Sequence, residues 1–454
     1  MGIQKNVKSP MTKDLLMTYT FYALFFIAFL SYFIFGLQSL AVSLVCVGVA
    51  ILCDLLLAKV TGKGNRPSAA VFGLIVAMSY SLGLPQYTMI IPQDIPTLAG
   101  GLEQFIYPAL ITAIGLIVFK QIAGKAHRKY VNPAAISKLL VLGLLFMLIT
   151  PAALDYSALI PKDHVDTIFL LNPLTPDAFG GPDFYPMDTS AFGSTLLSCY
   201  SNSYTPYSLG SYENPLPDVL FTMLFAKFHG WIGGFSSIIV IIVGIALFLL
   251  ARGYIKWRIT VSYLIATAIV AAVMGVVYGG DILLRVVFHV FMGSSIFMAF
   301  FMATDPATTP LTKLGQNIFG VGLAIITVLM QTYTGFLGAS IVGLVIMNVA
   351  TPILDKVGVP KPNEERKKIK LPKAQRFDSV AVTDCIRCGK CMTVCCRNLP
   401  VILIKEAVDK GDWAKAEKLG ATYCEDCGQC SFVCPARIDL RTIVVSARDK
   451  IKSQ

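Results

Sequence analysis

The chain has 454 residues, of which 55% are hydrophobic and only 14% are charged. Its mean hydropathy of +0.67 excludes an ordinary soluble globular protein of this size. The formal net charge of +11 does not indicate nucleic-acid binding, because the Lys and Arg residues lie between apolar runs rather than among aromatic residues on a polar surface.

The chain contains about ten apolar segments that approach the roughly 20 residues needed to cross a bilayer. They lie at residues 17–36, 39–58, 68–84, 104–120, 134–152, 235–251, 259–278, 285–303, 314–331 and 336–354. The first segment follows Lys5, Lys8 and Lys13 and has no small-residue cleavage site, so we expect it to be retained rather than removed as a signal. We therefore predict an all-α polytopic membrane protein.

Positive charge falls on alternate connections between these segments, which predicts their orientation. The connections after the second, fourth, sixth and eighth segments hold Lys59, Lys63 and Arg66, then Lys120, Lys125, Arg128 and Lys129, then Arg252, Lys256 and Arg258, and finally Lys313. The opposite connections at 36–39, 85–103, 279–281 and 331–335 hold neither Lys nor Arg. Cytoplasmic loops carry the excess of positive residues, so we predict a protein of the inner (cytoplasmic) membrane with both termini in the cytoplasm.

The longest outer connection, 153–234, divides the segments into two groups of five. An odd number of spans in each half requires the second half to be inverted relative to the first, as in several transporter folds. We predict two inverted five-helix repeats, 1–152 and 235–357, separated by an extracytoplasmic loop region. This pattern alone is also typical of a channel or carrier.

A hydrophilic segment at 358–377 follows the last span and is predicted to be a basic linker. Its Lys and Arg residues would suit the anionic inner leaflet, where each contributes about 1 kcal/mol. The same run also has the composition of a simple stop-transfer charge cluster.

The region 378–454 holds two cysteine motifs. The first comprises Cys385, Cys388, Cys391 and Cys395, and the second comprises Cys424, Cys427, Cys430 and Cys434. Two runs of C-x2-C-x2-C-x3-C are typical of two [4Fe-4S] clusters in which the fourth Cys of each run binds the other cluster. We therefore predict that Cys434 completes the first cluster and Cys395 the second, in a small ferredoxin-like α domain.

Two features of this region leave alternatives. Pairs of Cys in C-x2-C spacing also suit tetrahedral zinc, although two complete four-Cys runs favour clusters. Cys396 stands where the first motif would ordinarily have Pro, so it is either a spare thiol or a competitor of Cys395. Between the motifs, residues 404–419 are predicted to be a helical stretch that spaces the two motifs. No nucleophile or acid–base pair accompanies the cysteines, and we assign no catalytic side chain.

Polar residues within the apolar segments are further candidates. Asp281, Arg285 and His289 recur at helical spacing and would share one face of the eighth segment. This stripe could line a flavin or ion path, or Asp281 could pair with Arg285 while His289 is hydrogen-bonded in the bundle. Lys138, at the inner end of the fifth segment, is expected to extend its charge to the membrane surface.

Several segments resemble the RnfD/NqrB family of membrane subunits. They are residues 132–134, 230–236, 288–293, 300–320 and 345–352. The resemblance covers roughly residues 9–357. The cysteine region is similar to the two-cluster segment of the Rnf C subunit, including the run from Cys434 to Ile438. Together they suggest an RnfD/NqrB-type subunit fused to an RnfC-like two-cluster domain.

The resemblance implies flavin mononucleotide joined through its phosphate to a Thr on the outer side. The family pattern D-x-x-[ST]-G-[AS]-T is matched at its end by Gly193, Ser194 and Thr195. Phe192 replaces the expected Ser or Thr, and Asp188 lies one residue too far upstream. Thr195 is thus the candidate for covalent FMN, with an ordinary Ser/Gly/Thr turn as the alternative. A second, noncovalent flavin such as riboflavin is also compatible with the resemblance.

The function implied is that of a translocase subunit that moves Na⁺ or H⁺ as electrons pass between a cytoplasmic low-potential carrier, the two clusters and FMN. Its expected partners are other membrane and flavin subunits of an Rnf/Nqr-like complex, a soluble ferredoxin or NADH-linked carrier, and the lipid membrane, with no nucleic acid. Alternatives are an inverted-repeat channel or carrier with a redox-sensing iron–sulfur domain, and a quinone reductase without pumping. The coupling ion, the direction of electron flow and the role of Cys396 are left open.

Overall fold

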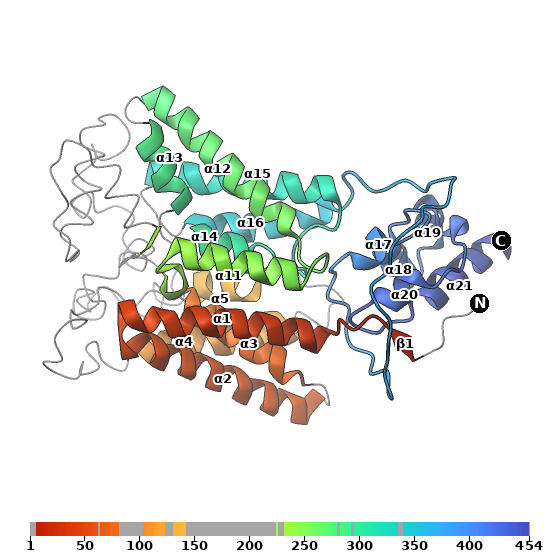
Figure 1. The fold of residues 1–454 in the computed structure, drawn as a ribbon, viewed down its shortest axis with the longest axis horizontal. Coiled ribbons are helices and arrows are strands. Elements are labelled where there is room, and N and C mark those ends of the chain that lie inside the picture. Colours follow the sequence, from red (N-terminus) through yellow and green to blue (C-terminus); the bar gives the residue numbers. More distant parts are fainter. Residues whose placement is uncertain are drawn as a thin grey trace, which may run out of the picture.

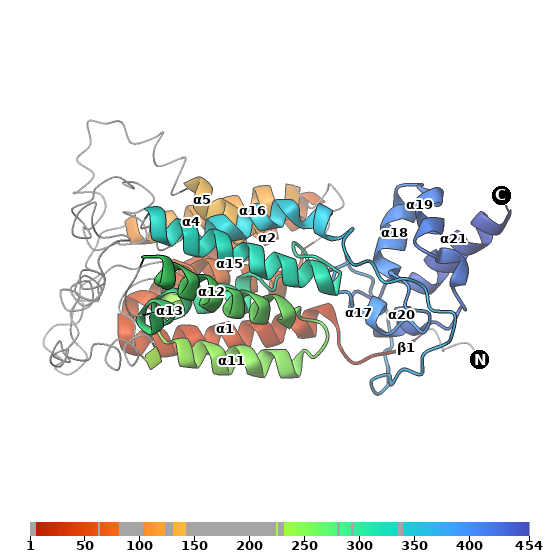
Figure 2. The ribbon, with the colours of Figure 1, turned by 90° about the horizontal axis from the view of Figure 1, so that it is seen from above.

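The computed structural model describes residues 6–61, 64–80, 103–122, 130–141, 224–225, 231–278, 282–291, 295–334 and 339–453. They form a bundle of long helices with a small cysteine-containing part at one end (Figure 1). The view from above shows the same end-to-end arrangement (Figure 2). We call the small part, residues 358–453, the cysteine half.

The bundle is built from helices of the predicted apolar segments. They are α1 (Lys13–Phe35), α2 (Leu37–Thr61), α3 (Arg66–Met78), α4 (Glu103–Ile114), the π-helical segment η1 (Gly115–Ile122), α5 (Pro133–Leu139), the short turn η5 (Ile232–Gly234), α11 (Ser237–Leu250), α12 (Trp257–Tyr278), α13 (Ile282–Phe291), α14 (Ser295–Phe297), the π-helical turn η6 (Met298–Met302), α15 (Lys313–Thr334) and α16 (Ala339–Leu354).

Within the described residues, four helices are long and apolar enough to cross a membrane. They are Lys13–Phe33, Leu37–Lys59, Trp257–Val277 and Lys313–Thr332. The helices Arg285–Phe291 and Ser295–Met302, inclined at 54°, form a fifth if they are counted as one broken span. Shorter apolar helices occur at Arg66–Met78, Phe105–Phe119, Ser237–Leu250 and Ala339–Leu354. The chain is therefore a multi-pass membrane protein, while the ten spans and the inverted repeats stay predictions.

Asn132 links the two predicted membrane halves at the start of α5. Its side-chain oxygen accepts hydrogen bonds from the backbone N–H groups of Ala134 and Ala135, which caps the helix. Pro133 follows at the first helical position, where its missing N–H removes no helical hydrogen bond. The Asn132 amide nitrogen then donates to the carbonyl of Met302 at 3.2 Å. One side chain thus caps the start of α5 and holds the end of η6.

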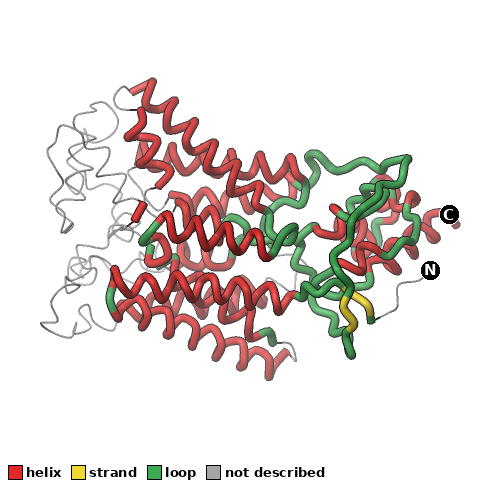
Figure 3. Tube along the Cα trace, viewed as in Figure 1, coloured by secondary structure: helices red, strands yellow, loops and turns green. Residues whose placement is uncertain are grey.

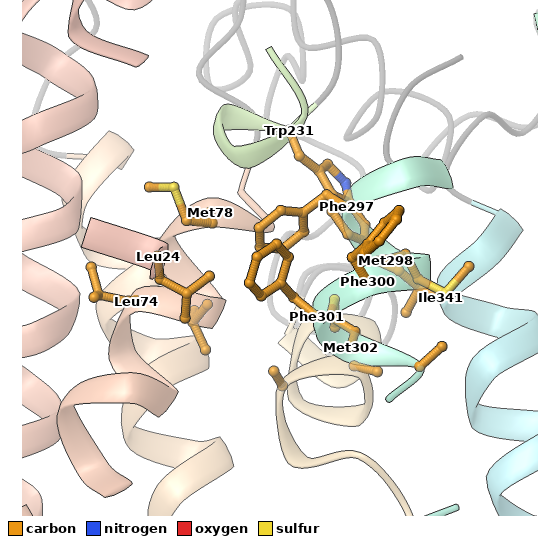
Figure 4. Packing of buried hydrophobic residues seen from close by; sticks show 14 of the residues in the cluster. Leu24, Leu74, Met78, Trp231, Phe297, Met298, Phe300, Phe301, Met302 and Ile341 are labelled. Atoms are coloured by element: carbon orange, nitrogen blue, oxygen red, sulfur yellow. The ribbon is translucent and has the colours of Figure 1, made fainter. Parts of the chain in front are cut away.

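A buried aromatic cluster continues this contact between the halves (Figure 4). Trp231 and Phe297 meet edge to face with ring centroids 6.2 Å apart, and both are fully buried. The backbone beside them is held by a hydrogen bond from Ile232 N to the carbonyl of Tyr80. Residues before and after the long outer connection therefore share one core.

Replacing Gly233 with Ala is expected to lower the stability of this core by about 1–3 kcal/mol, because it overpacks the site. A Cβ at Gly233 would lie 2.7 Å from Met78 Cβ and 2.7 Å from the ring of Phe297. Gly48→Ala is the matched control, since a Cβ there meets nothing within 4 Å. Thermal unfolding in detergent measures both variants, and equal stability of the two would contradict the tight packing.

The cysteine half consists of short helices and one small two-stranded sheet (Figure 3). Its elements are β2 (Gln375–Arg376), α17 (Lys390–Thr393), α18 (Val401–Asp409), α19 (Trp413–Lys418), η7 (Ala421–Tyr423), α20 (Gln429–Val433) and α21 (Leu440–Ser453). The partner of β2 is β1 (Val7–Lys8), which pairs antiparallel with Val7 opposite Arg376. The N-terminal segment therefore lies at the same end of the bundle as the cysteine half.

The stretch 404–419 is helical as predicted, but it is divided into two helices. The structure has α18 and α19 there, separated by a turn at Gly411, whose φ of 71° falls in the left-handed region. Asp412 then caps α19 by accepting the backbone N–H of Lys415 at 3.0 Å. Glycine in this conformation and a new N-terminal cap end one helix and begin the next.

The basic linker, residues 358–377, runs along the first cysteine motif, and we call it the strap. Asn363 N donates to the carbonyl of Arg397 at 2.9 Å, and Lys367 N donates to the carbonyl of Cys396 at 3.0 Å. The side chains of Lys367 and Lys368 stay exposed. The strap is thus fixed by its backbone, and contact of its charges with lipid stays a prediction.

Candidate functional site

The two cysteine motifs fold into equivalent turns. Corresponding positions share a left-handed backbone, namely Arg387 (φ 53°) with Asp426 (φ 61°), Gly389 (φ 75°) with Gly428 (φ 72°), and Asn398 (φ 59°) with Arg437 (φ 60°). Each turn reverses the chain tightly around its cysteines, and a short helix follows the glycine in both motifs. The sequence repeat is therefore also a structural repeat.

One cavity gathers three cysteines of the first motif and the last of the second. Cys385, Cys388, Cys391 and Cys434 line this space. Cys388 also packs against an apolar group at the end of the bundle that includes Tyr254. We call this space the proximal cavity because it faces the helix bundle.

The second cavity gathers the complementary set and one extra thiol. Cys395, Cys396, Cys424, Cys427 and Cys430 line a space beside α21. We call it the distal cavity. The structure thus brings together the two crossed groups of four that the spacing predicts, and it places Cys396 with the second group.

Cys391, Cys396 and Cys434 are buried and the other cysteines of the two cavities are half-buried, which affects their charge. Burial raises the pKa of Cys388 to about 12, and burial likewise raises the pKa of Cys430 to about 12. Isolated thiols in these positions would keep their protons at neutral pH. Metal binding takes the deprotonated form and releases the proton, so these cavities suit a group that supplies positive charge to several sulfurs.

The donor arrangement differs from that of a single-ion site. Across the part of the chain that the structure describes, no three His, Cys, Asp or Glu side chains are grouped so as to hold one metal ion. Tetrahedral zinc needs four donors within about 2.3 Å of one point. Each cavity is instead lined by at least four cysteines, which is the number of thiolates that a [4Fe-4S] cluster takes.

An ion pair joins the proximal cavity to the helix bundle. Arg387, between Cys385 and Cys388, donates to the Asp355 carboxylate at 2.7 Å, and each side chain is only 6% exposed. Asp355 follows α16, and its other oxygen accepts the backbone N–H of Leu311 at 2.8 Å. Arg387 also pairs with Glu406 of α18. One guanidinium therefore connects the motif turn, the last membrane helix and the cysteine half.

Lys256 braces the loop beside this ion pair. Its ammonium group donates to the carbonyls of Pro306 (2.8 Å) and Thr309 (2.7 Å) and to the Thr309 hydroxyl (3.0 Å). Burial lowers the pKa of Lys256 to about 7, and the nearby Arg387 lowers it as well. The loop that follows η6 is thereby held against the start of α12.

Tyr254 provides a second connection. Its hydroxyl donates to the carbonyl of Val433, which precedes Cys434, and lies 3.3 Å from the hydroxyl of Ser9. Ser9 N in turn donates to the carbonyl of Phe432. The N-terminal segment, the connection between α11 and α12, and the second motif are therefore tied together at the proximal cavity.

The sequence patterns do not predict these connecting residues as parts of a site. By sequence, Lys256 is only a positive residue of a cytoplasmic connection, and Arg387 and Asp355 carry no assignment. The available signal is an Arg inside a cysteine motif and an Asp directly after the last span. Neither position identifies the other as its partner, because the pairing arises from how the two parts dock.

Charged side chains also surround the distal cavity. Arg441 of α21 pairs with Asp426, and Arg448 donates to the carbonyl of Cys424 at 2.8 Å. Glu425 pairs with Arg397 and with Arg366 of the strap. The second motif turn is thus held on one side by α21 and on the other by the strap.

Two other candidates lie outside the described residues. They are Thr195, with the whole 153–223 stretch of the outer loop, and Asp281. His289 is described, and its Nδ1 lies 2.9 Å from the side-chain oxygen of Gln331 on α15. His289 therefore has the hydrogen bond within the bundle that one of the two interpretations expected.

The expectation that Lys138 extends to the membrane surface is wrong. Lys138 is 4% exposed, and its ammonium group donates to the carbonyl of Ser79 at 2.5 Å. The same group lies 4.5 Å from the centre of the Trp231 ring. A carbonyl and an aromatic face compensate the charge inside the bundle, so the side chain has no need to reach the aqueous boundary.

The bundle, its apolar spans and the docked cysteine half define the class of the chain, which is a multi-pass membrane protein with an attached cysteine-rich part. The NQR2, RnfD, RnfE family matches residues 4–364. The chain therefore belongs to this family. The match ends before the first cysteine motif, so the two cavities lie beyond it.

Curated relatives agree with this assignment. The chain is 26% identical over 344 residues to the D subunit of the Na(+)-translocating ferredoxin:NAD(+) oxidoreductase complex of Acetobacterium woodii, and the match covers 74% of this chain and 87% of that protein. It is 26% identical over 334 residues to the D subunit of the proton-translocating complex of Clostridium ljungdahlii, covering 72% and 85%. The D subunit of the ion-translocating oxidoreductase complex of Pectobacterium atrosepticum is 27% identical over 260 residues, covering 56% and 70%.

Proposed function

We propose that the chain is the membrane subunit of an ion-translocating redox complex of Rnf/Nqr type and that its cysteine half relays electrons through two [4Fe-4S] clusters. The observation that carries the proposal is the pair of cavities, each lined by a crossed set of four cysteines, at the end of a bundle of this family. Family membership alone supports the membrane part, and the cavities support the relay.

The proposed ligands of the proximal cluster are Cys385, Cys388, Cys391 and Cys434. Those of the distal cluster are Cys395, Cys424, Cys427 and Cys430. When bound, such clusters accept and pass single electrons. The protein contributes burial, thiolate ligands and fixed distances, because the motif turns and their surrounding ion pairs hold the cysteines in place.

The position of the cavities supports an order for the relay. Cys391 of the proximal set and Cys430 of the distal set are close enough to influence each other's charge, which makes the cavities neighbours. The proximal cavity is tied to α16 through Arg387 and Asp355, whereas the ion pairs around the distal cavity join the second motif to α21, Arg397 and the strap. A soluble carrier would exchange electrons with the distal cluster, and the proximal cluster would face the membrane part.

The proposal includes covalent FMN at Thr195 on the opposite side of the membrane, with the cysteine half in the cytoplasm. A hydrocarbon core of about 30 Å would separate the two sites, which is too far for direct electron transfer. A further cofactor in a neighbouring subunit is therefore required. Two relatives are named as parts of ferredoxin:NAD(+) oxidoreductase complexes, which supports a ferredoxin or an NADH-linked protein as the soluble carrier.

Cofactor analysis of the purified chain tests the proposal. We expect about eight iron and eight sulfide per chain for two clusters, together with one or more flavins. Covalent flavin should fluoresce in a denaturing gel, and Thr195→Ala should abolish that fluorescence without loss of iron. A preparation containing zinc and no sulfide would contradict the relay, and fluorescence that survives Thr195→Ala would exclude that residue as the attachment site.

Ion coupling needs a separate measurement. In sealed vesicles containing the whole complex, electron flow from a reduced low-potential carrier should drive uptake of Na⁺ or H⁺. Turnover without uptake would instead indicate a quinone reductase or other oxidoreductase that does not pump. Sidedness is checked by labelling introduced cysteines at 195 and at exposed positions of the strap from either face of the membrane.

A further inference from the structure

The distal cavity has one thiol more than its proposed cluster needs. Cys396 directly follows the ligand Cys395, and Pro435 directly follows the ligand Cys434 in the proximal cavity. The two positions are equivalent in the structural repeat. The two cavities therefore differ at this point, because proline has neither a backbone N–H nor a side-chain donor.

Cys396 is fixed beside a proposed ligand of the distal cluster. Its sulfur lies 3.5 Å from the sulfur of Cys427, within hydrogen-bonding distance for thiols, and the residue is only 1% exposed. Its carbonyl accepts the backbone N–H of Lys367 from the strap, which limits movement of the residue. The thiol thus has a defined neighbour and is shielded from water.

A second acceptor competes for the same proton. The Glu425 carboxylate lies 3.7 Å from the Cys396 sulfur, which is a longer contact than the one to Cys427. Glu425 is also engaged by Arg397 and Arg366. The two Arg side chains offset the charge of this carboxylate. The sulfur of Cys427 is the nearer acceptor, and as a ligand thiolate it would carry negative charge that favours a hydrogen bond from Cys396.

We propose that the Cys396 thiol donates a hydrogen bond to the Cys427 sulfur and thereby raises the reduction potential of the distal cluster. The inference rests on the proposed function, since it requires a cluster in the distal cavity. Hydrogen bonds to ligand sulfurs are among the features that set the potentials of such clusters. The reduced cluster carries more negative charge on its sulfurs, so a donor stabilises the reduced state more than the oxidised state.

The repeat makes this effect specific to one cluster. Pro435 offers no equivalent donor to the proximal cluster, so Cys396 would separate the potentials of two otherwise similar sites. Cys396 acts through its hydrogen bond to a ligand sulfur and does not itself bind iron. Its removal should leave both clusters assembled.

The test is a redox titration of the full chain followed by electron paramagnetic resonance, with Cys396→Ala and Cys396→Pro beside the parent protein. We expect both variants to keep their iron and sulfide and to shift one of the two potentials downwards. A tenfold change in the one-electron equilibrium corresponds to about 59 mV, which such a titration resolves. Cys396→Ser keeps a donor and should recover part of the shift, and Pro435→Cys should raise the other potential.

The remaining outcomes distinguish a failure of this inference from a failure of the proposed relay. Unchanged potentials in Cys396→Ala, with both clusters present, would refute the hydrogen bond as a control of potential. Loss of about four iron in Cys396→Ala would mean that Cys396 is itself a ligand of the cluster, which also refutes the inference. A parent protein without iron and sulfide would instead refute the proposed relay.

Discussion

Cys434→Ala is expected to remove the proximal cluster and to leave the distal one, although Cys434 belongs to the second motif. The Cys434 side chain lines the proximal cavity with three cysteines of the first motif. A cubane cluster takes four thiolates, so loss of one leaves an iron atom without its protein ligand. We expect the iron content to fall by about half, and electron paramagnetic resonance of the reduced chain to lose one of two signals.

Cys395→Ala is the matched variant, because it removes a first-motif thiol that lines the distal cavity. It should eliminate the signal that survives in Cys434→Ala. Cys46→Ala serves as a control within the bundle core, where the thiol is fully buried and far in sequence from both motifs, and it should retain all iron. If Cys434→Ala and Cys424→Ala remove the same signal, each motif binds its own cluster and the crossed assignment is wrong.

The grouping of the cysteines could be predicted because it depends on local spacing. Two residues between cysteines allow a tight turn, and left-handed backbone at Gly389 and Gly428 completes that turn in each motif. The x3 spacing before the fourth Cys of each run then indicates that this Cys binds the cluster of the other motif. The same local reasoning located the apolar helices, since their composition alone requires a nonpolar environment.

Contacts between distant segments could not be predicted in this way. A helical pattern indicated that 404–419 is helical but not that Gly411 adopts φ 71° and divides it. The prediction for Lys138 rested on its place near a helix end, yet its environment is set by Ser79 and Trp231, which come from other segments. The hydropathy pattern defines spans and their order, whereas compensation of a buried charge depends on which residues the fold brings near it.

The pair between Arg387 and Asp355 illustrates the same limit at the site itself. Its two residues belong to the cysteine half and to the end of the last membrane helix, and each side chain is 6% exposed. Replacing a buried ion pair with well-packed apolar residues is often neutral, while removing one partner is costly. We therefore expect this pair to hold the cysteine half on the bundle, a contact that the sequence patterns do not indicate.

Asp355→Ala is expected to loosen the cysteine half from the bundle, because it removes the buried one of the two carboxylates that pair with Arg387 and leaves only the partly exposed Glu406. It also removes the acceptor of Leu311 N–H. Breaking such a pair costs about 3–5 kcal/mol, which would raise local opening at least roughly 100-fold. Hydrogen–deuterium exchange of peptides containing Arg387 measures this opening.

Two variants make the Asp355 result specific to the buried pair. Asp449→Ala breaks an exposed pair with Arg448 and should change exchange little, since solvent already screens that interaction. The double variant Asp355→Leu with Arg387→Met removes both charges of the buried pair and should restore much of the protection, because Glu406, which loses Arg387, is 32% exposed and keeps contact with water. Unchanged exchange in Asp355→Ala would show that the ion pair does not hold the two parts together, and that Tyr254 and the N-terminal strand suffice. Loosening that the double variant fails to reverse would instead assign the effect to the contacts that it does not replace, namely the Leu311 hydrogen bond and the pair between Arg387 and Glu406.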